Sequence, residues 1–136
     1  MTAKEYLKQY EEYDRRARRY KAEYEREAEL IDAIRSPSAS DGMPHGSGIS
    51  RTTEDKAIRL SEKRLKWKEA ELDALHVRQQ IFETIQKVSG IEGDVLIEKY
   101  VNLKTWEQIA EEYHYTVRGI QYAHGRALLM VAERMK

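Results

Sequence analysis

The chain has 136 residues, which is enough for one small domain or for one domain with an extended appendage. Its 24 basic residues equal its 24 acidic residues, so no overall charge attracts the protein to nucleic acid. The absence of cysteine excludes disulfides and thiolate metal sites, and no apolar run is long enough for a membrane span or a signal peptide, so we expect a cytoplasmic protein without membrane contact.

Residues 2–34 contain neither glycine nor proline, and they predict one long helix. Mostly small, tyrosine and isoleucine side chains recur along it at alternating spacings of three and four, with Glu27 as the polar exception. This is the heptad seam of a coiled coil, and because tyrosine hydroxyls must reach water or a partner, we expect a partly open seam. The seam positions are Ala3, Tyr6, Tyr10, Tyr13, Ala17, Tyr20, Tyr24, Glu27, Ile31 and Ile34.

Residues 35–52 predict a flexible loop, because they hold both prolines together with many serines and glycines. A second long helix is predicted from an N-cap at Thr53 to about Val88. Two long helices joined by a loop indicate an antiparallel, coiled-coil-like hairpin, and a loop of this length also allows exchange between protomers. The predicted apolar stripe of the second helix is Ile58, Leu65, Leu72, Leu75, Phe82 and Ile85, with Trp67, Ala74, Val77 and Ile81 on a neighbouring face.

Two glycines, Gly90 and Gly93, predict a hinge after the second helix. We therefore expect an all-α protein with two domains, a two-helix hairpin over residues 1–89 and a C-terminal module over residues 90–136. Because a two-helix hairpin has little core of its own, we also expect self-association, with a dimer favoured over larger oligomers.

The C-terminal module predicts a helix-turn-helix. Thr105 is a good N-cap, and Gln108 three residues later completes a capping box. Thr116 is the next capping residue and opens a second, longer helix. The side chains expected to be buried between these helices are Trp106, Ile109, Ala110 and Tyr113 from the first and Ile120, Ala123, Ala127, Leu128 and Val131 from the second.

Polar and aromatic side chains stand near the start of that second helix. Arginine, glutamine and tyrosine there have the chemistry to reach phosphates and base edges in a DNA major groove. Residues 114–136 carry four basic residues and one acidic residue, a net charge of +3, so we expect one copy to bind DNA weakly. The candidate DNA-binding residues are Thr116, Val117, Arg118, Gln121, Tyr122 and Arg126.

Residues 94 to about 131 resemble region 4 of bacterial sigma factors, the module that reads the promoter −35 element. Residues 95–100 are similar to its first helix, residues 105–113 to its supporting helix and residues 116–128 to its recognition helix. His114 stands at the turn where that family usually has glycine. The resemblance implies that the DNA-facing positions are Val117, Arg118, Gln121, Tyr122 and Arg126.

The whole layout, a helical N-terminal half, a Met-Pro-His-Gly-Ser-Gly loop at 43–48 and this C-terminal module, is similar to small transcription regulators of phages and prophages of the RinA and ArpU kind. The resemblance implies a sequence-specific activator of phage genes at promoters in the bacterial host, with double-stranded DNA and RNA polymerase as partners. Nothing upstream resembles the sigma region that binds core polymerase, so we do not expect a complete sigma factor.

The sequence indicates no enzyme, because the histidines lack metal-ligand spacing and the carboxylates alternate with lysine and arginine. We expect no metal and no cofactor, and we expect His114 and His124 to face phosphate or solvent. Two other functions remain open. One is a DNA-binding phage assembly protein such as a small terminase subunit, which a ring of eight or more subunits would favour. The other is a coiled-coil adaptor whose C-terminal helices bind protein, which indifference to DNA would favour.

Overall fold

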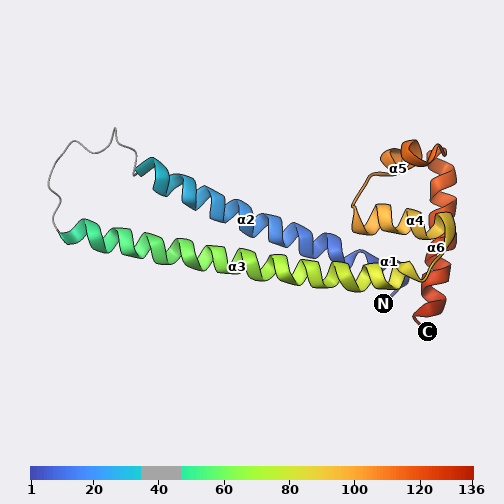
Figure 1. Ribbon diagram of the computed structural model, residues 1–136, viewed down its shortest axis with the longest axis horizontal. Coiled ribbons are helices and arrows are strands. Elements are labelled where there is room, and N and C mark those ends of the chain that lie inside the picture. Colours follow the sequence, from blue (N-terminus) through green and yellow to red (C-terminus); the bar gives the residue numbers. More distant parts are fainter. Residues whose placement is uncertain (35–46) are drawn as a thin grey trace. The chain divides into compact units, whose positions relative to one another are not determined.

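The computed structural model describes residues 1–34 and 47–136, so residues 35–46 of the expected loop lie outside the described part of the chain. Throughout these two ranges the regular elements are helices, which confirms the all-α fold class there (Figure 1). None of the helices in these ranges combines the length and the apolar character that a membrane crossing requires. The elements are α1 (Ala3–Leu7), α2 (Gln9–Ile34), α3 (Ser47–Gln86), α4 (Gly90–Leu96), a π-helical segment η2 (Ile97–Val101), α5 (Trp106–Tyr113) and α6 (Val117–Arg134).

The first predicted helix is interrupted near its start. The Oγ1 atom of Thr2 accepts a hydrogen bond from the backbone N–H of Glu5 at 3.2 Å, and the Glu5 carboxylate accepts from the Thr2 N–H at 3.2 Å. This capping box starts α1, which ends at Leu7 with Lys8 as its C-cap before α2 begins. The heptad spacing runs through the break unchanged, so the apolar pattern contains no sign of it.

The second long helix begins earlier than predicted, at Ser47 instead of after a cap at Thr53. Residues 47–52 were expected to be loop, and that expectation is wrong. It rested on the glycine and serine content of the segment, which is only a weak preference that tertiary context overrides. The last proline is Pro44, so no residue from 47 onward prevents a helix.

The described residues form two compact units, one made of residues 1–14 and 73–136 and the other of residues 15–72. The sequence had suggested a division at residues 89/90 instead. The observed division differs from the predicted one because α1 and the end of α3 share a core with the C-terminal helices. Glycines between two helices indicate a turn, and they do not show whether the helices on either side pack together.

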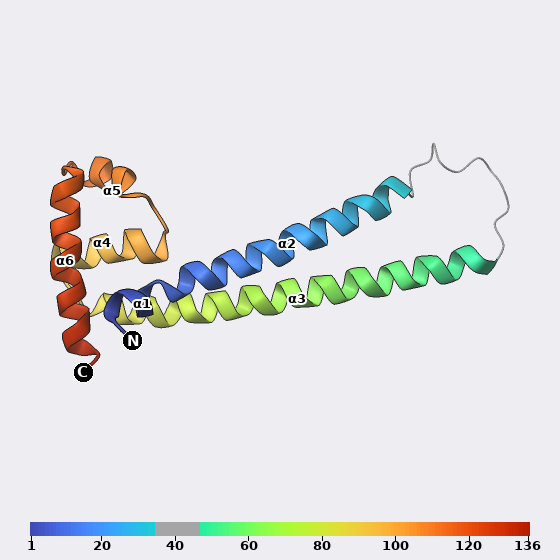
Figure 2. The same cartoon turned by 180° about the vertical axis from the view of Figure 1, so that it is seen from behind.

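The first unit contains two clusters of buried side chains, and α6 contributes to both. Helices α4 and α5 pack against the same side of α6 (Figures 1 and 2). The larger cluster is formed by Ala3, Leu7, Ile81, Ile85, Val88, Leu96, Tyr100, Val101, Ala127 and Val131. The smaller cluster, which holds α4, α5 and α6 together, is formed by Val95, Ile109, Ala110, Ile120 and Ala123.

In the second unit, α2 and α3 contact each other through the predicted seam of α2. The rings of Tyr24 and Trp67 lie 5.3 Å apart between centroids. The polar seam residue Glu27 receives a hydrogen bond from the ammonium of Lys63 at 3.3 Å, so its carboxylate has a partner within the contact. Ala17 of the seam is buried, and the tyrosines of this unit are half-buried, as a partly open seam requires.

The predicted apolar stripe of α3 is exposed over most of its length. Ile58, Leu65, Leu72 and Leu75 keep 58%, 60%, 66% and 53% of their surface accessible. The buried face instead includes the alanines Ala70 and Ala74. Ile85 of the predicted stripe is buried, and so are Ala74 and Ile81 of the predicted neighbouring face. The buried residues of α3 are Ala70, Ala74, Ile81 and Ile85.

Candidate nucleic-acid interface

Hydrogen bonds from capping side chains start both α5 and α6. The Thr105 Oγ1 atom accepts from the Gln108 N–H at 3.2 Å, and the Gln108 side-chain oxygen accepts from the Thr105 N–H at 2.9 Å. At the start of α6, the Thr116 Oγ1 atom accepts from the Gly119 N–H at 3.0 Å. The capping box and the second cap are therefore confirmed, and residues 114–116 form the turn between the helices.

His114 ends α5 in the left-handed conformation, with φ 57° and ψ 40°. Side chains other than glycine adopt this conformation at a cost, because the Cβ atom approaches the backbone. The turn is closed by the N–H of Tyr115, which donates to the carbonyl of Ala110 at 2.9 Å. His114 therefore adopts a backbone conformation that glycine adopts more readily.

The interface between α5 and α6 is apolar and closely packed. Ile109 and Ile120 are fully buried, and Ala110 is nearly so, which lets the two helix backbones approach. Trp106 and Val117 pack against this cluster and are half-buried. The predicted burial of Ile109 is confirmed, and that of Trp106 is only partial.

Three of the six candidate residues come together on the exposed side of α6. Arg118, Gln121 and Tyr122 line one shallow hollow. The Arg118 guanidinium donates to the Tyr122 hydroxyl at 3.3 Å and lies 5.7 Å from the centroid of its ring. Tyr122 is 60% exposed, so the group presents a cation, an amide and a phenol to solvent within two helical turns.

The other three candidates are placed differently. The Thr116 hydroxyl oxygen is engaged in the cap of α6, and Val117 packs partly against the apolar cluster. Arg126 lies farther along α6, and its Nε atom donates to the carboxylate of Glu92 on α4 at 3.1 Å. A backbone hydrogen bond and the Arg126 side chain lower the pKa of Glu92, so Arg126 is paired with a stable negative charge.

His124 does not face solvent or phosphate, so that expectation is wrong. It is 8% exposed, and its Nε2 atom lies 2.6 Å from the hydroxyl oxygen of Tyr100. The Trp106 ring meets it edge-on at 4.8 Å between centroids. Burial, helped by the charges of Lys4 and Lys99, lowers the pKa of His124 to about 4. The sequence contained a signal for this position, because His124 follows Ile120 by four residues and precedes Ala127 by three.

An ionic cluster beside α5 was not foreseen. The Lys104 ammonium donates to the carboxylates of Glu98 and Glu112, the latter at 2.6 Å. Hydrogen bonds to Glu112 and Glu98 raise the pKa of Lys104. This cluster ties η2 to the end of α5 through the intervening loop.

No family model matches the chain, and neither the curated proteins nor the solved structures compared with it contain a match.

Proposed function

We propose that the protein is a sequence-specific, double-stranded DNA-binding transcription regulator of the small phage type, acting at promoters in the bacterial cytoplasm. In this proposal α5 and α6 are a helix-turn-helix of the sigma region 4 kind, and α6 is the recognition helix. The observation that carries the proposal is the exposed group of Arg118, Gln121 and Tyr122 on the first turns of α6. In a helix-turn-helix, the N-terminal residues of the second helix contact the base edges.

The turn geometry supports this proposal. A helix-turn-helix needs a short turn that changes the chain direction sharply, and His114 adopts the left-handed conformation at this turn. It does so at the position where sigma region 4 usually has glycine. The two helices are each capped by a threonine, so their ends are fixed relative to the turn.

The candidate residues have separate proposed roles. Arg118 and Gln121 can each form paired hydrogen bonds, with guanine and adenine edges respectively. Tyr122 orients Arg118 through the hydrogen bond between them. Thr116 is proposed to contact the phosphate backbone through its hydroxyl proton, since its oxygen accepts in the cap, and Arg126 through its terminal nitrogens, since its Nε is bonded to Glu92. Val117 is proposed to contact a thymine methyl group at the edge of the interface. RNA polymerase is the proposed partner for activation.

A second copy of the chain is part of the proposal, because one copy offers few cations to DNA. The exposed face of α3 carries Ile58, Leu65 and Leu72 at intervals of seven residues, the spacing of a coiled-coil seam. In a parallel dimer along this seam, Arg64 of one copy would face Glu69 of the other, an attractive pair. Lys68 lies between two of the leucines along the seam, so the dimer should be of modest affinity.

Binding to DNA selected from a random duplex pool tests the proposal, with fluorescence anisotropy at two salt concentrations. We expect selection to converge on a defined sequence, and affinity to fall steeply with salt. Light scattering of the same sample measures how many copies of the chain associate. A dimer supports the regulator, whereas a closed ring of eight or more subunits supports an assembly protein. A failure to bind any duplex at low salt supports the coiled-coil adaptor.

A further inference from the structure

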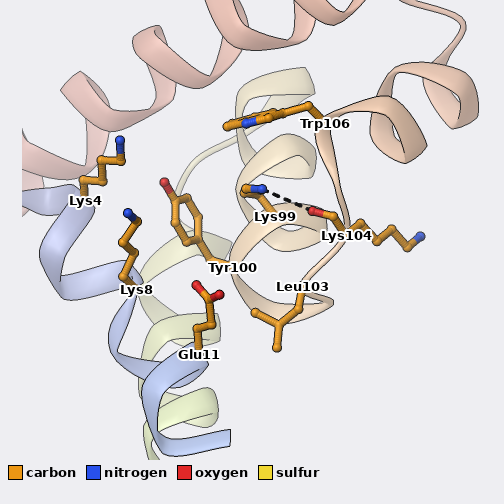
Figure 3. A pocket seen from close by; sticks show the side chains of 8 residues that line it. All are labelled: Lys4, Lys8, Glu11, Lys99, Tyr100, Leu103, Lys104 and Trp106. Atoms are coloured by element: carbon orange, nitrogen blue, oxygen red, sulfur yellow. Dashed lines mark hydrogen bonds between the residues drawn. The ribbon is translucent and has the colours of Figure 1, made fainter. Parts of the chain in front are cut away.

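A cavity of about 310 Å³ lies in the first unit, between α1, the start of α2, η2 and the beginning of α5 (Figure 3). Its walls come from segments that are about ninety residues apart in the chain. Lys4 and Lys8 line it from one side and Lys99 from the other, with Tyr100 drawn between them and the Lys99 ammonium turned toward the backbone carbonyl of Lys104. Trp106 closes one end.

The charges around this cavity are unbalanced. Among the residues that the structure describes, neither Lys4 nor Lys8 has an ion-pair partner. The ammonium of Lys99 donates to the backbone carbonyl of Lys104 at 3.4 Å and lies 4.5 Å from the centroid of the Trp106 ring. Among the described residues that line the cavity, Glu11 is the only carboxylate. In a chain with equal numbers of acidic and basic residues, this is a local excess of positive charge.

Lys104 also lines the cavity, but its charge is used elsewhere. Its ammonium is bound by Glu98 and Glu112 and points away from the other lysines in Figure 3. The positive charges of Lys4 and Lys99, by contrast, help to lower the pKa of His124 and so to keep its ring uncharged. An anion between these two lysines would offset their repulsion of a protonated imidazole.

We propose that this cavity binds a phosphate group through the ammonium groups of Lys4, Lys8 and Lys99. Three separate point-charge donors suit the oxygens of a tetrahedral oxyanion, whereas a carboxylate has only two oxygens in one plane. The phosphate has two sources. One is the DNA backbone, which the first helix of a helix-turn-helix crosses, and in that case the inference rests on the proposed function. The other is a free phosphorylated small molecule, and in that case it stands alone.

Trp106 fluorescence measures the binding directly once Trp67 is replaced by phenylalanine. Inorganic phosphate and pyrophosphate are titrated at constant ionic strength, with sodium chloride as the balancing salt. We expect a saturable signal whose affinity falls at least fivefold in Lys4→Gln and Lys8→Gln, and stays unchanged in the exposed control Lys66→Gln. Circular dichroism confirms that the variants keep their helices.

The same variants, titrated with the selected duplex, distinguish the two sources. If the phosphate belongs to DNA, each lysine substitution lowers the slope of log affinity against log salt by about one. If the duplex binding is unchanged while phosphate binding is lost, the ligand is a free phosphorylated molecule. If neither phosphate binding nor the salt slope responds to either substitution, the inference is overturned. Phosphate binding without any DNA binding would overturn only the proposed function.

Discussion

The hydroxyl oxygen of Tyr100 lies 2.6 Å from the Nε2 atom of His124, inside the unit that carries the candidate interface. This hydrogen bond connects η2 to α6, and both residues are buried. Burial, followed by the charge of Glu11, raises the pKa of Tyr100 to about 12. The phenol thus keeps its proton and the imidazole stays neutral at ordinary pH, so the pair is a neutral hydrogen bond that positions α6.

Acidification should destabilise the protein through His124. The pKa of this residue is lowered to about 4 in the folded state from a usual 6.5, so the unfolded chain binds the proton more readily. Its contribution to stability is complete above about pH 6.5 and is lost as the pH falls toward 4, by roughly 3 kcal/mol at most. Urea unfolding at pH 7 and pH 4.5 measures this loss in the free energy of unfolding. His124→Gln should flatten the pH dependence relative to the exposed control His76→Gln, and equal pH dependence in both variants would contradict the assignment.

Tyr100→Phe should lower the free energy of unfolding by about 1–2 kcal/mol, because it removes the only polar partner that the structure shows for the buried His124 ring. The matched control is Tyr115→Phe, since Tyr115 is 48% exposed and a lost hydroxyl there is replaced by water. Denaturant unfolding of the three proteins provides the comparison. Equal stabilities for the two variants would mean that the hydrogen bond contributes nothing.

Two glycines should respond in opposite directions to alanine. A Cβ atom at Gly93 would lie 2.1 Å from the backbone carbonyl oxygen of Val88, so Gly93→Ala must shift the chain and should cost more than about 2 kcal/mol. A Cβ atom at Gly125, within α6, would meet nothing within 4 Å. Gly125→Ala should therefore stabilise the protein by about 0.5–1 kcal/mol, because alanine favours helix. Thermal unfolding distinguishes the two, and a tolerated Gly93→Ala would contradict the close approach.

The proposed parallel dimer can be tested by disulfide formation, since the natural chain has no cysteine. Under mild oxidation, Leu65→Cys should form a covalent dimer, because equivalent seam positions meet at the axis of a parallel pair. Lys66→Cys, one residue further along and also exposed, should form much less. Equal cross-linking at both positions, measured on a non-reducing gel, would indicate random collision. Arg64→Glu should weaken the dimer, and adding Glu69→Arg should restore it.

The parts of the structure that the sequence predicted well depend on neighbours within a few residues. The caps at Thr105 and Thr116 and the burial of Ile109 follow from local spacing, and all three are confirmed. The hollow formed by Arg118, Gln121 and Tyr122 also follows from helical periodicity, because these residues lie within four positions of each other.

The parts that the sequence missed depend on residues far apart in the chain. Which face of α3 is buried depends on contacts with distant segments, such as those of Ile81 and Ile85 with Leu7 and Val131, and the pattern of α3 alone offered two faces. The buried environment of His124 comes from Tyr100 and Trp106, and the lysine-lined cavity needs α1 beside η2. No short-range pattern reports such contacts.

The most direct test of the central claim compares two arginines of the same helix. Arg118 lies at the start of α6 in the exposed hollow, whereas Arg134 is the last residue of α6 and is also exposed. We expect Arg118→Ala to weaken binding to the selected duplex about 5- to 150-fold and to relax base preference at one position, as loss of 1–3 kcal/mol implies. Arg134→Ala should leave the base preference intact. Equal affinities and equal preferences for both variants and the parent protein would show that α6 is not a DNA recognition helix.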